Sequence, residues 1–238
     1  MAPHLIEGRT VAMPVRVRDA SFCGAAYAVR ADAARAVIAY SGLDVAEILP
    51  GKAVCVLLFA DYRDGDLDAY HEFGMAFLIR PPGSTGWTRP GDLRDAAAFI
   101  HWLPVDQRFT MEAGRTLWGF PKEQADIDLR LASPYKRCIL RKDGRLVLDM
   151  LVKPGVPLPG PTPLIAFDAF THREGVTRRV PMKVQARGVR VRPSGALIRL
   201  GNHPIAKELS ELGLPSRPLL STMVTRTAMS LREAEPQG

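Results

Sequence analysis

The stretch AVCVLLFADYRDGDLDAYHEFGMAFLI, residues 53–79, holds two apolar runs, 53–62 and 70–79, joined by RDGDLDA. Each run has the length and the residue types of a β-strand, and the Asp and Gly residues between them are typical of a hairpin connection. Further strand patterns follow at 96–105, 124–132, 137–151 with a turn at 142–144, 164–170, 180–191 and 196–200. Helical patterns occur at 31–40, 106–117 and 203–212. Consecutive strands with few intervening helices predict an α+β chain that is mainly antiparallel β, a barrel or sheet with a few peripheral helices.

The segment KPGVPLPGPTPL, residues 153–164, contains five prolines. Proline lacks an N–H group and has a fixed φ angle, so this segment cannot form a central strand or a helix. We interpret it as a loop or crossover inside one domain that spans residues 1–238. A linker between two domains is the alternative.

The composition, with 47% hydrophobic and 24% charged residues, is that of a globular protein and excludes disorder, collagen and coiled coil. No segment has the ~18 uncharged apolar residues of a membrane helix, and residues 1–18 lack the apolar core of a secretory signal. The three cysteines, Cys23, Cys55 and Cys138, are odd in number and far apart, which fits neither a disulfide framework nor a CxxC metal knuckle. These features predict a cytoplasmic protein that does not bind membranes.

The net charge of +7 raises the question of nucleic-acid binding. The densest basic stretch, residues 173–192, interleaves its arginines with valines, which is the alternation of a strand with one solvated face. No helix-turn-helix, zinc-finger or RNP motif accompanies it. We therefore favour a solvated strand and no nucleic-acid partner, and keep a nucleic-acid binder as the alternative.

Several catalytic motifs are missing from the sequence. It has no phosphate-binding G-x-x-x-x-G-K-[ST] loop, no G-x-G-x-x-G, no H-E-x-x-H and no G-x-S-x-G. Its five histidines are dispersed. The sequence therefore predicts neither a metal site nor a cofactor.

One motif, LWGFPKEQADIDL at 117–129, places Lys122 after Gly-Phe-Pro, between a predicted helix and an alternating strand. At the usual lysine pKa of about 10.4, roughly one amine in 10³ to 10⁴ is neutral at pH 7, so covalent catalysis by a lysine needs desolvation or a neighbouring charge. The apolar side chains of Trp118 and Phe120 are candidates for that desolvation. The alternative is a lysine that begins a strand and extends to water.

A second candidate, Glu72, lies in AYHEFGMAFLI at 69–79. By strand alternation it shares a face with Gly74, Ala76 and Leu78. A buried carboxylate needs a partner, and Lys122 could be that partner. An exposed glutamate at a strand end is the alternative.

Three segments together resemble the acetoacetate decarboxylase family. DYRDGDLDAYHEFGMAFLI, 61–79, is similar to the family's Y-x-E-x-G strand pair, and EAGRTLWGFPKE, 112–123, to its G-R-E and Y-P-K-K segment. GALIRLGNHPIAKELSELGLPS, 195–216, is similar to its C-terminal strand and helix. The resemblance covers most of the chain and implies the family's fold and a homo-oligomer.

The resemblance also implies roles for individual residues. Lys122 corresponds to the Schiff-base lysine, Glu72 to the active-site glutamate, and Arg18, placed ahead of the first strand, to the arginine that binds the substrate carboxylate. In the family mechanism the lysine attacks a ketone, and the resulting iminium accepts electrons as CO₂ leaves.

The chain also departs from the family pattern. Glu123 replaces a second lysine, Phe120 replaces a tyrosine, and a further family glutamate falls near Leu57. An anion at position 123 that faced Lys122 would stabilise the ammonium form of that lysine. Two alternatives stay open: the Glu123 side chain points away from Lys122, or it acts as an acid–base partner. We group Glu123, Phe120 and Trp118 with Arg18 as expected substrate-binding residues.

These observations predict a cofactor-independent lyase that works through a lysine iminium on a small oxo acid. Decarboxylation of a β-keto acid such as acetoacetate is the first hypothesis. An aldolase or dehydratase acting on a 2-oxo acid is the second, and a non-catalytic barrel that binds a small molecule is the third.

Overall fold

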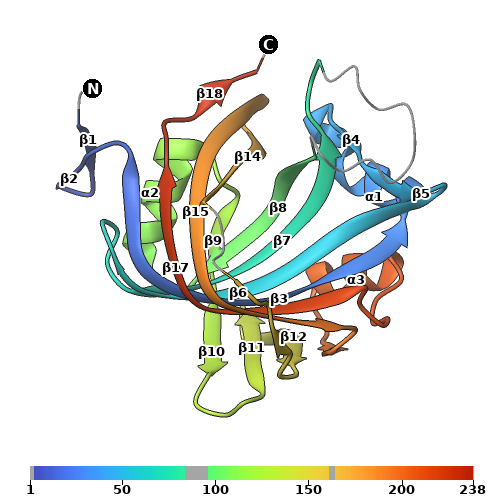
Figure 1. The fold of residues 1–238 in the computed structure, drawn as a ribbon. Coiled ribbons are helices and arrows are strands. Elements are labelled where there is room, and N and C mark those ends of the chain that lie inside the picture. The colour runs from blue at the N-terminus through green and yellow to red at the C-terminus, as the bar shows by residue number, and fades with distance from the viewer. Residues whose placement is uncertain (1–2, 84–95, 161–163, 238) are drawn as a thin grey trace.

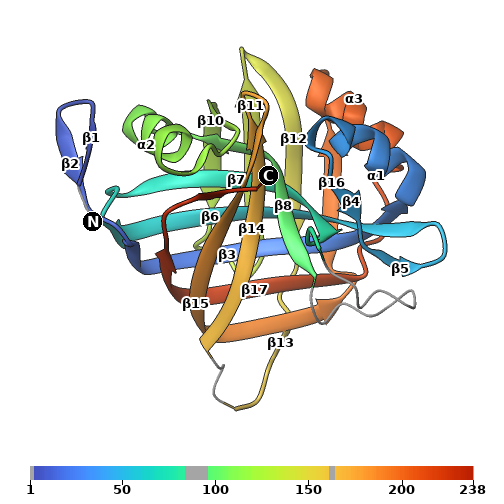
Figure 2. The same cartoon turned by 90° about the horizontal axis from the view of Figure 1, so that it is seen from above.

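The computed structural model describes residues 3–83, 96–160 and 164–237. Its largest sheet contains seven long strands, which are β3 (Val15–Arg30), β6 (Lys52–Gly65), β7 (Tyr70–Arg80), β8 (Ala97–Val105), β14 (Leu164–Arg173), β15 (Val176–Pro193) and β17 (Leu220–Leu231). They are ordered β7-β6-β3-β17-β15-β14-β8, and β8 also pairs with β7. The seven strands therefore form a closed barrel (Figure 1, Figure 2). Neighbouring strands are antiparallel, except that β14 and β8 are parallel.

Shorter elements surround the barrel. The edge strands are β4 (Asp44–Val45), β5 (Glu47–Leu49), β9 (Lys122–Gln124), β13 (Val156–Pro157) and β18 (Glu235–Pro236), and β1 (His4–Ile6) pairs with β2 (Arg9–Val11). A second sheet is made of β10 (Asp126–Arg130), β11 (Lys136–Lys142), β12 (Arg145–Val152) and β16 (Ala196–Leu200). The helices are α1 (Ala31–Ile38), which continues into the 3₁₀ turn η1 (Ala39–Ser41), α2 (Arg108–Trp118) and α3 (Pro204–Glu211). No helix in the described ranges is long and apolar enough to cross a membrane.

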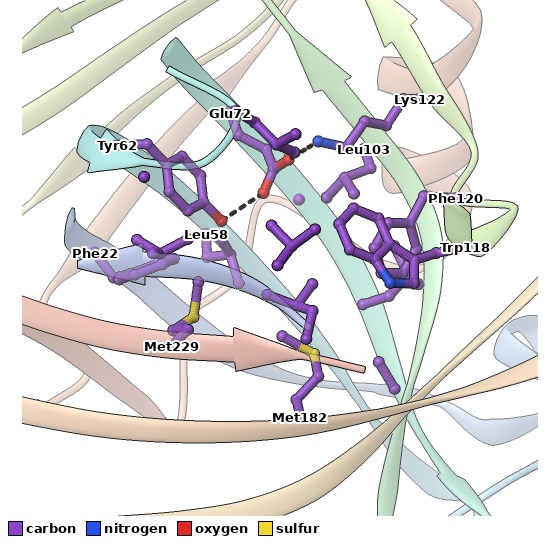
Figure 3. Close-up of a pocket in the computed structure, with 18 of the residues that line it drawn as sticks. Phe22, Leu58, Tyr62, Glu72, Leu103, Trp118, Phe120, Lys122, Met182 and Met229 are labelled. Atoms are coloured by element: carbon purple, nitrogen blue, oxygen red, sulfur yellow. Dashed lines mark hydrogen bonds and ion pairs between the residues drawn. The ribbon is translucent and has the colours of Figure 1, made fainter. Parts of the chain in front are cut away.

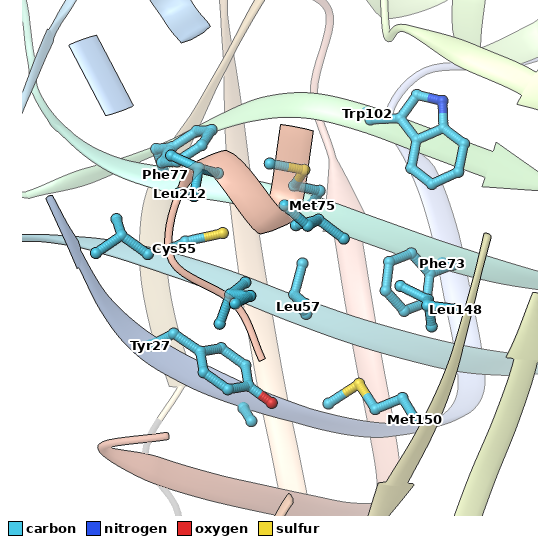
Figure 4. Close-up of a cluster of buried hydrophobic side chains, with 14 of the residues drawn as sticks. Tyr27, Cys55, Leu57, Phe73, Met75, Phe77, Trp102, Leu148, Met150 and Leu212 are labelled. Atoms are coloured by element: carbon cyan, nitrogen blue, oxygen red, sulfur yellow. The ribbon is translucent and has the colours of Figure 1, made fainter. Parts of the chain in front are cut away.

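The barrel strands are apolar on both faces because both faces are covered. Odd-numbered residues of β6 and β7, such as Leu57 and Phe73, point outward into a buried cluster that includes Leu148 and Met150 of the second sheet, and Phe77 lies beside Leu212 in the same cluster (Figure 4). Even-numbered residues of the same strands point into the barrel. This arrangement explains why the sequence of β6 is a continuous apolar run instead of an alternation.

The predicted fold class is confirmed, as are the hairpin at 53–79 and the three helices. Two barrel strands, β3 and β17, were not predicted. The proline-rich segment forms only the two-residue edge strand β13 in its described part, and residues 161–163 lie outside the described residues.

The basic stretch forms β15, as predicted, and several of its arginines bind groups of the same chain. Arg179 lies 2.8 Å from a carboxylate oxygen of Asp168 and 2.9 Å from one of Glu235. Arg190 donates a hydrogen bond to the carbonyl of Gly155. These charges therefore help to hold neighbouring strands and loops together.

Candidate active site

Lys122 and Glu72 form a buried ion pair. The Lys122 Nζ atom lies 2.7 Å from Glu72 Oε2, and the two side chains are 3% and 7% exposed (Figure 3). Lys122 is the first residue of β9, which lies beside β8, and Glu72 is near the start of β7. Lys122 therefore does not extend to water, and Glu72 is not an exposed strand end. A buried charge pair of this kind persists only where its geometry and remaining hydrogen bonds are good.

Helix α2 holds the lysine in place. Gly114 faces the Lys122 side chain so closely that a Cβ atom there would lie 2.5 Å from Lys122 Cδ. The neighbouring Arg115 donates a hydrogen bond of 2.8 Å from Nε to the Lys122 carbonyl. Gly119 ends the helix in the left-handed conformation, with φ of 69°, and turns the chain toward β9. The Gly-Arg and Pro-Lys elements of the motif thus meet around one side chain.

Two tyrosines complete the polar part of the site. The Tyr62 hydroxyl donates a hydrogen bond of 2.9 Å to Glu72 Oε1. Its ring stacks on Tyr70 with a centroid distance of 4.3 Å, and Lys122 Nζ lies 5.0 Å from the centre of the Tyr70 ring. Burial, followed by the negative charge of Glu72, raises the pKa of both tyrosines well above the usual value of about 10. Both are therefore neutral at pH 7, and Tyr62 is a hydrogen-bond donor to the carboxylate.

The ion pair borders a cavity of about 230 Å³ inside the barrel. Trp118 and Phe120 line it, as expected, and are 2% and 5% exposed. Leu58, Met182 and Met229 line it from three different strands (Figure 3). Its walls are mainly apolar, so the amine and the carboxylate of the pair are largely removed from water.

Arg18 does not reach this cavity, so its expected role in binding a substrate carboxylate is not supported. It lies within β3 and not ahead of the first strand. Val15, Arg16 and Val17 line the cavity, whereas the half-exposed Arg18 does not. The Arg18 guanidinium lies 2.6 Å from carboxylate oxygens of both Asp64 and Asp66.

Glu123 also points away from the cavity. Successive residues of β9 alternate, so Glu123 projects to the face opposite Lys122. Its carboxylate accepts a hydrogen bond of 3.1 Å from Trp102 Nε1 and lies 3.6 Å from Lys142 Nζ. The expected role of Glu123 in substrate binding, and the proposed effect of its charge on Lys122, are therefore not supported.

Sequence reasoning missed Tyr62 and Tyr70. Tyr70 is two residues before Glu72, so strand alternation alone places it on the same face. Tyr62 could be found only from the hairpin register, which pairs it with Tyr70. Within the described residues no group of three histidine, cysteine or carboxylate side chains could hold a metal ion.

Comparisons with known proteins assign the chain to a family. The acetoacetate decarboxylase family model matches residues 5–236. A comparison with curated protein sequences finds no match.

Three solved structures illustrate the likeness of fold. An acetoacetate decarboxylase from Legionella pneumophila is 17% identical with a TM-score of 0.68, and the match covers 96% of this chain and 88% of the other. The enduracididine biosynthesis enzyme MppR complexed with pyruvate is 18% identical with a TM-score of 0.63, covering 97% and 93%. An acetoacetate decarboxylase-like enzyme from Sphingomonas wittichii is 16% identical with a TM-score of 0.56, covering 95% and 94%. Because the family model extends over nearly the whole chain, this protein belongs to the acetoacetate decarboxylase family.

Proposed function

We propose that the protein is a lyase that forms a Schiff base between Lys122 and an oxo acid, and that it decarboxylates a 3-oxo acid. The observation that carries this proposal is the buried 2.7 Å pair of Lys122 and Glu72 on the wall of an apolar cavity. A covalent lysine catalyst needs a neutral amine, an acceptor for its proton and protection from water. The cavity supplies the protection from water, and Glu72 is a proton acceptor 2.7 Å from the amine.

The reaction begins with transfer of a proton from the Lys122 ammonium to Glu72. The neutral amine attacks the C3 carbonyl carbon, and loss of water gives an iminium. The C1–C2 bond then breaks, its electron pair moves toward the iminium nitrogen, CO₂ leaves and an enamine remains. Loss of water consumes the proton that Glu72 had accepted, so Glu72 takes up a proton from solvent and then, as the nearest acid, delivers it to C2. Hydrolysis of the new iminium releases the ketone and restores the Lys122 ammonium and the Glu72 carboxylate.

The surroundings of the pair favour this sequence of steps. A carboxylate that loses CO₂ disperses its charge, so an apolar site destabilises the reactant more than the transition state. The Tyr62 hydrogen bond holds one oxygen of Glu72 and leaves the other, Oε2, facing Lys122. The carboxylate is thereby kept in place for proton transfer.

An aldol or dehydration reaction of a 2-oxo acid is the second candidate. It uses the same lysine and the same iminium without loss of CO₂. MppR, which has a similar fold, has been described in complex with pyruvate and with the condensation product of pyruvate and an aldehyde. This relation favours testing 2-oxo acids beside 3-oxo acids.

The deciding experiment is reductive trapping. The protein is incubated with 3-oxo and 2-oxo acids and borohydride, and the adduct is located by mass spectrometry of its peptides. We expect an adduct on Lys122 and none on the Lys122→Ala variant, with Lys136→Ala as the control for a lysine outside the cavity. If no oxo acid labels Lys122, the protein is a non-catalytic binding barrel and the lyase proposal is wrong.

We further propose a cytoplasmic location and a homo-oligomer. The described cysteines are all free and buried, which is compatible with a reducing compartment. Leu164, Ile165 and Phe167 of β14 are large apolar residues exposed on the single chain. Light scattering after size-exclusion chromatography tests the oligomeric state, and a monomer at micromolar concentration would overturn that part of the proposal.

A further inference from the structure

The barrel is hollow beside the ion pair. A closed barrel of about eight strands is just wide enough either to be filled by side chains or to hold one small ligand. This barrel has seven strands, yet it encloses the cavity of about 230 Å³. Small residues on three strands leave the space open, namely Gly74 and Ala76 of β7, Ala98 of β8 and Ala169 of β14.

The small residues lie on the wall that leads away from the ion pair. Along β7, Glu72 is followed on the inner face by Gly74, Ala76 and Leu78. At about 3.4 Å per residue, the strand covers roughly 20 Å between Glu72 and Leu78. The hollow part of the barrel therefore extends from the reactive end along β7.

Hydrogen-bonded register places these wall residues in successive layers. Ala76 lies beside Val56 of β6 and Ile100 of β8. The next layer along β7 pairs Leu78 with Ala98. Ala98 in turn lies beside Ala169. Every residue of these layers is apolar, so an occupant finds no hydrogen-bond partner there.

The charged and polar lining residues lie elsewhere. Besides Lys122, Glu72 and the two tyrosines, the described lining contains three charged residues, Arg16, Asp64 and Asp68, at the start of β3, near the end of β6 and in the β6–β7 connection. A sugar, an amino acid or a dicarboxylate placed along the apolar layers would lose its hydrogen bonds to water without replacement. A hydrocarbon chain gains free energy in the same place.

From this separation we infer that the substrate is an unbranched aliphatic oxo acid whose tail is several carbons longer than the methyl group of acetoacetate. The inference rests on the proposed function and specifies its substrate class. The oxo carbon lies at Lys122, and the tail follows the layers toward Leu78 and Ala98. Met182 and Met229, which are flexible and polarisable, adapt to the tail from the opposite strands.

The test measures kcat/KM from CO₂ release with a homologous series of 3-oxo acids that have four, six, eight and ten carbons. Burial of one methylene corresponds to about a fourfold change in kcat/KM, so we expect a rise of about 250-fold between the four-carbon and the eight-carbon acid if all four added methylenes are buried. A flat profile, or one that falls with length while Lys122 is still labelled, would overturn the tail site and leave the lyase intact.

Two variants locate the tail. Ala76→Leu fills the layer nearer to Lys122, and Ala98→Leu fills the next, so we expect the optimum to move to a shorter acid in the first variant than in the second. Ala132→Leu, at an exposed position between β10 and β11, is the control and should keep the wild-type profile. Identical optima in all three variants would contradict the placement.

Binding of straight-chain methyl ketones, from 2-butanone to 2-nonanone, gives a readout that needs no turnover and no variant. We expect the ketone-induced rise in melting temperature to increase with chain length. If this rise occurs but no oxo acid labels Lys122, the tail site is supported and the proposed reaction is wrong. If the rise does not depend on length, the tail site is wrong.

Discussion

Replacement of Gly114 by alanine tests whether helix α2 positions the reactive amine. The new Cβ atom would lie 2.5 Å from Lys122 Cδ and 2.7 Å from Cε. Ordinary contacts begin at 3.4 Å, so Cδ has to move by about 0.9 Å. This displacement acts on the middle of a buried side chain whose Nζ lies 2.7 Å from Glu72. A shift of about 1 Å at a reacting group reduces the rate by roughly 10²-fold.

The same change should leave the fold intact. Gly114 is inside α2, and alanine favours a helix interior over glycine by about 0.8–1 kcal/mol. We therefore expect kcat to fall about 10²-fold with the most reactive 3-oxo acid. The gain in helix propensity offsets part of the ~1–3 kcal/mol cost of overpacking, so the variant should still unfold cooperatively, at a urea midpoint equal to or moderately below that of the wild type. Thr116→Ala changes an exposed residue of the same helix and is the matched control for helix propensity. A Gly114→Ala enzyme with wild-type kcat would refute the argument that this close approach holds the amine.

Three further predictions concern groups around and outside the cavity. Tyr62→Phe removes the 2.9 Å hydrogen bond to Glu72, and we expect urea unfolding to show a loss of about 1.5–3 kcal/mol; an unchanged free energy of unfolding would mean that this bond contributes nothing. Glu123→Lys places a cation beside Lys142 on the face opposite the cavity, so we expect kcat within about twofold of the wild type and a lower melting temperature; a large change in kcat would show that this charge does act on Lys122. Asp149, whose pKa is lowered by its hydrogen bonds to Arg137, contributes stability that is fully present above the unfolded pKa of about 3.9 and is lost as the pH falls through the lower folded value. Unfolding of the wild type and of Asp149→Asn between pH 6 and pH 3 should therefore converge toward the acid end, and parallel curves would contradict this assignment.

The sequence marks Lys122 and Glu72 as candidates because both residues interrupt strong local patterns, and the family resemblance favours a site over an exposed side chain. Glu72 lies within an apolar strand, and Lys122 follows a helix end and a proline. Strand alternation places Glu72, Gly74 and Ala76 on one face without knowledge of the partner strands. The same rule shows that Glu123 faces away from Lys122, although only the structure identifies which face is the inside of the barrel.

Strand β3 was not predicted from the sequence, for a physical reason. Strand β3, VRVRDASFCGAAYAVR, contains glycine, several alanines and charged residues, which have low intrinsic β-propensity. It is a strand because β6 and β17 pair with it on both sides. The position of Arg18 depends on that pairing, so its outward direction could not be read from residues near it in the sequence.

The placement of Lys122 on β9 has a consequence for how the chemistry of this scaffold can change. Among the residues that the structure describes, strand β9 pairs with β8 alone, and it is not one of the seven strands that close the barrel. Replacement of side chains in this short appended segment leaves the hydrogen-bond ladder of the barrel untouched. Side chains of β9 can therefore be exchanged to alter the proposed chemistry without any change in the strands that close the barrel.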